Sequence, residues 1–160
     1  MRELSTRKPN RLKGYDYSRN GAYFVTMCVK DRHEIFGQIV GATVPGRPSM
    51  EYSELGKFID ETIMYYIKIN TDVIFDRYVI MPNHIHMIII IRSETGDRGR
   101  SPLQFIVRNL KSYVTKQAGF SLWQKSFHDH IIRNENEYNK IADYIDNNPM
   151  LWKDDCFYPK

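Results

Sequence analysis

The sequence predicts an α+β domain in which helices pack on one side of an antiparallel β-sheet. Stretches dense in β-branched and aromatic residues alternate with stretches whose apolar residues recur every three or four positions, as in amphipathic helices. The connecting segments are too short for large crossovers everywhere, which favours antiparallel strand pairing. A chain of 160 residues fits one hydrophobic core.

The first half of the chain predicts strands followed by one helix. Residues 22–29 are rich in β-branched and aromatic side chains, which indicates a central strand. A shorter strand is expected at 34–40, and the glycines and prolines of 41–49 are typical of a turn or hairpin tip. Residues 53–69 show helical apolar spacing, and Ser53 is the expected N-terminal cap.

The second half predicts two neighbouring strands, a helix, a short strand and a last helix. The two strands are expected at 73–81 and 84–92, and their adjacency in sequence favours pairing. A serine and a proline open the helix expected at 101–117. Residues 127–132 form the expected last strand, and the final helix spans 134–147, ending just before a proline.

The basic charge of the chain is concentrated near its N-terminus. The formal net charge is +4, with a sequence pI near 9.0, which suits a polyanionic partner but does not require one. We predict that residues 1–20 form a basic arm that contacts nucleic acid. Its cations are Arg2, Arg7, Lys8, Arg11, Lys13 and Arg19, against the acidic Glu3 and Asp16.

The cysteines and the apolar runs exclude several classes of protein. Cys28 and Cys156 lie far apart and form no C-x-x-C pair, so neither a thiolate zinc site nor a disulfide framework is indicated. The polar N-terminus does not resemble a secretory signal, and no run reaches the ~20 apolar residues of a membrane helix. We therefore expect a soluble, cytoplasmic protein without a membrane partner.

His84 and His86 are the most informative residues. Residues two apart in a strand point to the same face, so the imidazoles lie side by side and form half of a metal site. The strand is otherwise very apolar, and burying these rings without partners would cost about 1–3 kcal/mol each. Two interpretations follow: hydrogen bonds alone satisfy the rings, or a metal ion does.

The final predicted helix carries a second polar pair. Tyr144 and Asn148 are one helical turn apart and project from one face, while Ile141 and Ile145 are suited to anchor the helix in the core. From spacing alone, packing of Tyr144 against the sheet is the favoured interpretation. A reactive phenol is the alternative.

Four motifs, in this order, resemble the HUH single-tyrosine transposases, and within them the REP-associated tyrosine transposases. Together they extend over most of the chain, and the ordered set is far more specific than any one motif. They are Gly21-Ala-Tyr-Phe-Val-Thr26, Val79-Ile-Met-Pro-Asn-His-Ile-His86, Trp123-Gln124 with His128-Asp-His-Ile-Ile-Arg133, and Tyr144-Ile-Asp-Asn-Asn-Pro149.

The resemblance implies the HUH endonuclease fold, a ferredoxin-like sheet with the histidines on a central strand facing the tyrosine helix. By position, His84 and His86 match the metal-binding pair and Tyr144 matches the nucleophile. Asn148 matches the residue that completes the metal site. Many relatives carry Gln there, and the shorter amide keeps the oxygen ligand.

The implied activity is nicking and rejoining of single-stranded, hairpin-bearing DNA through a covalent 5′-phosphotyrosine. A divalent ion, Mg²⁺ or Mn²⁺, assists the step, and no nucleotide cofactor is needed. Two imidazoles and an amide suit Mn²⁺ better than the oxygen shell that Mg²⁺ prefers. Two other functions stay open: a non-cleaving regulatory protein that binds DNA repeats, and a metallohydrolase using the same histidines and water.

Further residues are candidates for DNA contact or support. Tyr113, on the helix expected at 101–117, is the rival nucleophile, but it matches no family tyrosine. His128 and His130 share a strand face, which allows a second metal site, whereas the resemblance favours substrate contact or support of the active site. Asp129 is the other supporting candidate. The predicted DNA contacts are Arg7, Lys8, Arg11, Lys13, Lys111 and Arg133.

The expected organisation is a basic arm at 1–20, a catalytic domain at 21–150 and a C-terminal tail at 151–160. No segment is obviously suited to exchange between subunits, so a monomer is expected, with a dimer as the alternative.

Overall fold

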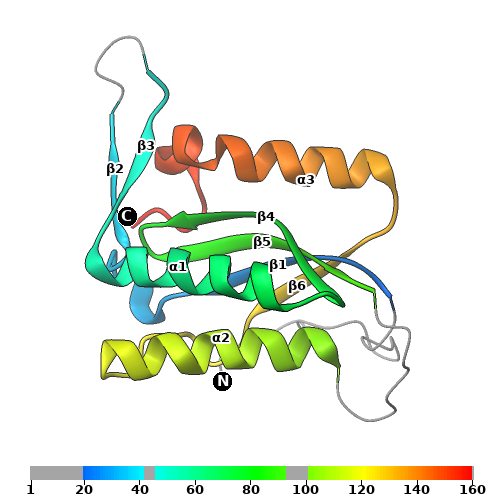
Figure 1. Cartoon of the computed structure of the whole chain (residues 1–160). Helices are drawn as coiled ribbons and strands as arrows, with labels where there is room; N and C mark the ends of the chain where they lie inside the picture. Colours follow the sequence, from blue (N-terminus) through cyan, green and yellow to red (C-terminus); the bar gives the residue numbers. More distant parts are fainter. Residues whose placement is uncertain (1–19, 42–45, 93–100, 160) are drawn as a thin grey trace, which may run out of the picture.

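The computed structural model describes residues 20–41, 46–92 and 101–159 (Figure 1). The expected antiparallel α+β fold is confirmed: four strands pair antiparallel in the order β4-β5-β1-β6. The inner strands are β1, Gly21–Cys28, and β5, His84–Ile91. The edge strands are β4, Val73–Met81, and β6, His128–Ile132.

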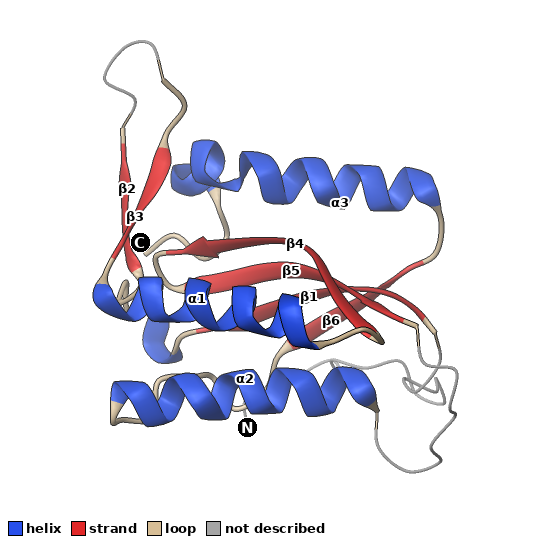
Figure 2. Cartoon of the chain, in the orientation of Figure 1, coloured by secondary structure: helices blue, strands red, loops and turns tan. Residues whose placement is uncertain are grey.

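Helices cover both faces of this sheet, which corrects the expectation that they pack on one side. Helices α1, Glu54–Ile69, and α2, Pro102–Ala118, lie against one face, and α3, Glu135–Asn147, lies against the other (Figure 2). The physical reason is visible in β5, which is apolar at both odd and even positions. A strand with two apolar faces needs a covering layer on each.

The two faces have separate hydrophobic cores. The larger core joins α1 and α2 to the face that carries Tyr23, Val25 and Met87. The smaller core contains Ile88 of β5 with Ala142 and Ile145 of α3. Alternation along β5 therefore places the side chains of His84 and His86 on the α3 face.

Helix boundaries follow the expected caps. The Ser53 hydroxyl accepts a hydrogen bond from the Gly56 amide at 3.1 Å, and the Ser101 hydroxyl accepts one from Gln104. Strand β2, Gly37–Val40, pairs antiparallel with β3, Ser49–Tyr52, a strand that was not expected from the sequence and that begins where the expected hairpin tip ends. In the described part of the chain, no helix has the length and apolar character needed to cross a membrane.

Candidate active site

The strand register places both histidines at the centre of the sheet. His86 lies between Thr26 of β1 and Val79 of β4, and His84 is the first residue of β5. Both rings are buried, with 0 % of His84 and 2 % of His86 exposed, and their centroids are 4.5 Å apart. The expected side-by-side pair is therefore present in the structure.

A hydrogen bond at Nδ1 orients each ring. The Asn83 side chain donates to the carbonyls of Arg32 and Phe157, so its oxygen faces His84 Nδ1 at 2.8 Å. That oxygen can only accept, which puts the His84 proton on Nδ1 and leaves Nε2 with a free lone pair. His86 Nδ1 lies 2.7 Å from the Thr26 hydroxyl, the equivalent partner on β1. Ligating histidines in metal sites are commonly held in this way.

Helix α3 brings Tyr144 to the histidines. The phenol oxygen is 3.3 Å from His86 Nε2, and Phe24 packs edge-on against the phenol ring while stacking on His86. Asn148 follows Tyr144 by one helical turn, at the C-terminal cap of α3, and is fully buried. Helical spacing thus delivers phenol and amide to one side of the pair, as expected from the sequence.

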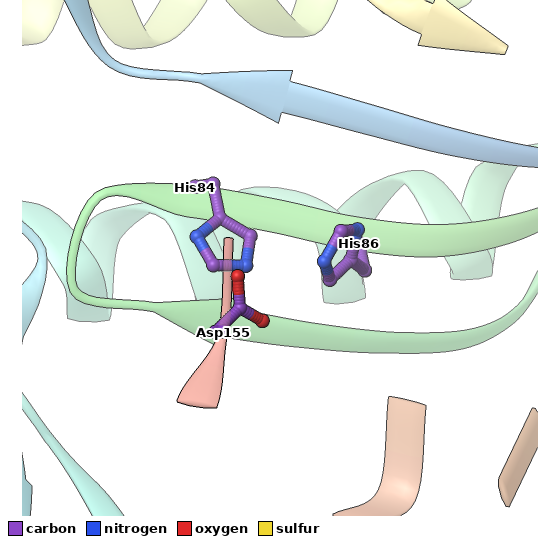
Figure 3. Close-up of side chains that lie close together, drawn as sticks. All are labelled: His84, His86 and Asp155. Atoms are coloured by element: carbon purple, nitrogen blue, oxygen red, sulfur yellow. The ribbon is translucent and has the colours of Figure 1, made fainter. Parts of the chain in front are cut away.

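Asp155 is a site residue that the sequence analysis did not identify. The 3-10 helix Asn148–Asp154 turns the chain back toward the sheet, and the Asp155 carboxylate points at the two rings (Figure 3). One ligand atom from each of Asp155, His84 and His86 lies within 4.8 Å of the others. The carboxylate also accepts hydrogen bonds from Tyr144, at 3.2 Å, and from the Asn148 amide, at 3.3 Å.

Burial controls the electrostatics of the site. It lowers the pKa of His84 from 6.5 to about 3, opposed by the nearby Asn148 amide, and it also lowers the pKa of His86. Both rings are therefore neutral at pH 7, as metal ligands must be. Burial, reinforced by the Asp155 charge, raises the pKa of the Tyr144 phenol from 10.0 to about 12.

Two buried atoms of this site lack a hydrogen-bond partner among the described residues: His84 Nε2 and the Asn148 side-chain oxygen. Unpaired buried polar atoms are costly and rare, so a ligand that uses both is a physical explanation for them. Imidazole nitrogens with amide and carboxylate oxygens form a mixed donor set that suits Mn²⁺ and related divalent ions. The residues present therefore fit a divalent metal.

The other predicted residues are spread over the molecule. Lys111 donates its ammonium hydrogens to the carbonyls of Gln124 and Ser126, at 2.8 and 3.2 Å, and so braces a loop. His130 is half exposed and pairs with Glu137 at 2.6 Å, and the same carboxylate accepts from the Arg133 amide. Both oxygens of Asp129 are buried.

Several predicted residues lie away from the histidines or outside the described residues. Tyr113 is exposed on α2, where its ring stacks on Phe58 across the sheet from the histidines. The arm residues Arg7, Lys8, Arg11 and Lys13 lie outside the described residues. Tyr144 therefore contacts the histidine pair, whereas the rival nucleophile Tyr113 lies on the opposite side of the sheet.

Comparisons with solved structures define the class of fold. The chain matches the structure described as the REP-associated tyrosine transposase bound to a REP hairpin, with a TM-score of 0.62 and 20% sequence identity over 88% of this chain and 73% of that one. It also matches a putative transposase from Deinococcus radiodurans, with a TM-score of 0.50 and 15% identity over 86% of this chain and 95% of that one. The fold relationship predicted from the motifs is thereby confirmed.

The sequence comparison assigns the family. An uncharacterized Haemophilus influenzae protein is 34% identical over 173 residues, covering 95% of this chain and 93% of that protein. The chain therefore belongs to the same family as that protein. No family model matches the sequence.

Proposed function

We propose that this protein nicks and rejoins single-stranded DNA through a covalent bond to Tyr144. The proposal rests on three side chains that meet at one point. The Tyr144 phenol oxygen lies within 3.3 Å of both His86 Nε2 and the Asp155 carboxylate. The shared fold with transposases supports the reaction class, and the REP hairpin bound to one of them supports DNA as the substrate.

A divalent metal would be held by the imidazole nitrogens of His84 and His86, with the side-chain oxygens of Asn148 and Asp155 as further ligands. When bound, the ion polarises a nonbridging phosphate oxygen and stabilises the charge of the transition state. The chain's own contribution is preorganisation. Thr26 and Asn83 hold the two rings, so no reorientation is needed when the ion and the DNA arrive.

Tyr144 acts as the nucleophile. Its oxygen attacks the phosphorus, the bond from phosphorus to the 3′ oxygen breaks, and the DNA 5′ end is left on the tyrosine. The proton lost by the phenol passes to Asp155, its hydrogen-bond acceptor, and the departing 3′ oxygen takes a proton from water to become a hydroxyl. Attack by another 3′ hydroxyl reverses these steps and rejoins the strand.

Contacts to DNA by Lys111, Arg133 and the basic arm stay predictions, as do the monomeric state and support by His130 and Asp129. The expected boundary between a catalytic domain at 21–150 and a tail at 151–160 also stays a prediction. Asp155 lies beyond that boundary, so the proposed site uses residues from both segments.

The proposal is tested with DNA hairpins that carry single-stranded flanks, incubated with the protein and Mn²⁺ or Mg²⁺. A protein–DNA band that survives denaturation is expected for the wild type and is lost in Tyr144→Phe. Tyr113→Phe is the matched control, because it removes an exposed phenol from the opposite side of the sheet.

Each other outcome points to a different function. An adduct that persists in Tyr144→Phe excludes this nucleophile. Binding without cleavage under either metal ion supports a regulatory DNA-binding protein. Cleavage without an adduct supports a hydrolase that uses water.

A further inference from the structure

A cavity lies outside the proposed active site, at the edge of the sheet where β1 ends and β6 begins. Its volume is about 840 Å³. Its lining includes Lys30, Asp31, Trp123, Gln124, Lys125 and His128. The mechanism above uses none of these residues.

The walls of this cavity are held by hydrogen bonds on several sides. Val29 and Trp123 form a β-bridge, flanked by bonds from the Lys30 amide to the Leu122 carbonyl at 2.7 Å and from the Gln124 amide to the Cys28 carbonyl at 2.9 Å. Lys111 of α2 also donates hydrogen bonds to the Gln124 and Ser126 carbonyls of this wall. The cavity is therefore a preformed feature, which reduces the ordering cost of binding.

The cations at the rim are exposed and unneutralised. Lys30 and Lys125 both face solvent, and neither ammonium forms an ion pair within the ranges that the structure describes. Asp31 is the one acidic residue in the lining. The lysines, with the polar His128 and Gln124, suit a phosphate-bearing ligand that also offers hydrogen-bonding groups.

The turn that carries Lys30 has a strained backbone. Asp31 and Arg32 adopt φ values of 57° and 59°, a left-handed conformation that Asp tolerates and that costs Arg32 roughly 1–2 kcal/mol. The Arg32 carbonyl is held by the Asn83 side chain, whose oxygen in turn faces His84 Nδ1. The rim of the cavity is thus tied to the histidine pair, and such strain is typical of ligand-binding loops.

The sheet places this cavity within reach of the phenol. Thr26 of β1 pairs with His86 on one side and with His128 on the other. The backbones of His86 and His128 are therefore two strand spacings apart, at about 4.8 Å each, and one DNA strand can bridge this distance.

From the preformed walls, the unneutralised lysines and this adjacency, we propose that the cavity binds a nucleotide of the single-stranded DNA flank next to the scissile phosphate. The inference rests on the proposed function and adds where the unpaired strand is held. Lys30 and Lys125 bind its phosphates, and Trp123 supplies an apolar wall.

The test measures binding without cleavage. Fluorescence anisotropy in EDTA gives the dissociation constant of one DNA hairpin with, and the same hairpin without, an oligothymidine flank. The double variant Lys30→Ala/Lys125→Ala is expected to bind the flanked hairpin several-fold more weakly and the blunt hairpin as the wild type does. Its salt dependence on flanked DNA is expected to lose about 1.4 units of slope, since each single-strand phosphate contact contributes about 0.7.

The matched control is Lys57→Ala/Lys68→Ala, which removes two exposed lysines of α1 that do not line the cavity. This variant is expected to bind both hairpins as the wild type does. Equal weakening for flanked and blunt hairpins, or no weakening at all, overturns the inference. Because no chemistry occurs in EDTA, absence of a Tyr144 adduct would overturn the proposed function while leaving this result intact.

Discussion

Replacing Thr26 by Val is expected to weaken metal binding without moving any proposed ligand. Valine matches threonine in shape but cannot contact His86 Nδ1, which the hydroxyl now meets at 2.7 Å. Both residues are buried, at 5 % and 2 % exposure, so water does not replace the lost partner. Removing such a partner costs about 1–3 kcal/mol of unfolding free energy, and loss of an outer-shell bond typically weakens metal affinity about 10–100-fold.

Titration calorimetry with Mn²⁺ measures the affinity, and urea unfolding in EDTA measures the stability separately. Thr26→Ser is the matched control, because it keeps the hydroxyl and removes only a methyl group. Its Mn²⁺ affinity is expected to stay close to that of the wild type. If Thr26→Val binds Mn²⁺ as tightly as the wild type, or if the serine variant loses as much affinity, the hydroxyl does not orient His86.

Three further predictions address the site and the fold. In EDTA, the unfolding free energy is expected to decrease as the pH is lowered from 6.5. Histidines of the unfolded chain then gain protons, whereas His84, with its pKa of about 3, stays neutral in the folded protein. Each buried histidine contributes up to about 1.4 kcal/mol per pH unit, and urea unfolding of His84→Gln should show a shallower dependence. Asp155→Asn is expected to reduce Mn²⁺ affinity by about tenfold, seen by calorimetry, since a carboxylate ligand becomes a neutral amide. Gly56→Ala is expected to destabilise the protein by about 1–3 kcal/mol in urea, because the new Cβ would lie 2.1 Å from the Phe36 carbonyl oxygen.

Each of these predictions has a result that contradicts it. An equal pH slope in wild type and His84→Gln would show that His84 does not titrate on unfolding. Unchanged Mn²⁺ affinity in Asp155→Asn would remove Asp155 from the ligand set. Stabilisation by Gly56→Ala, the direction that helix propensity alone favours, would mean that the close approach of α1 to Phe36 relaxes freely.

The parts of the site that could be predicted lie on regular elements. Period-two alternation places His84 beside His86, and helical spacing places Tyr144 above Asn148, whatever else the fold does. Asp155 follows an irregular 3-10 helix, where no periodic pattern relates a side chain to the sheet. Its contact with the histidines depends on how the chain turns after α3, which is a tertiary property.

The position of α3 was recognisable from β5, although the sequence analysis assigned all helices to one side. After His86, Ile88 and Ile90 continue the apolar character on the histidine face, which indicates a second covering layer. Strand β3 was harder to identify, because its four residues follow a segment rich in glycine and proline. Short edge hairpins depend on pairing more than on composition.

The unequal size of the two cores implies that the two halves of the site differ in local stability. β5 contributes to the large core under α1 and α2, whereas α3 is anchored by the small cluster around Ile88 and Ile145. In hydrogen exchange, the amides of α3 should therefore open well before those of β5. If Tyr144 is the nucleophile proposed above, a DNA end bound to it would move with α3 while β5 keeps the two histidines in place.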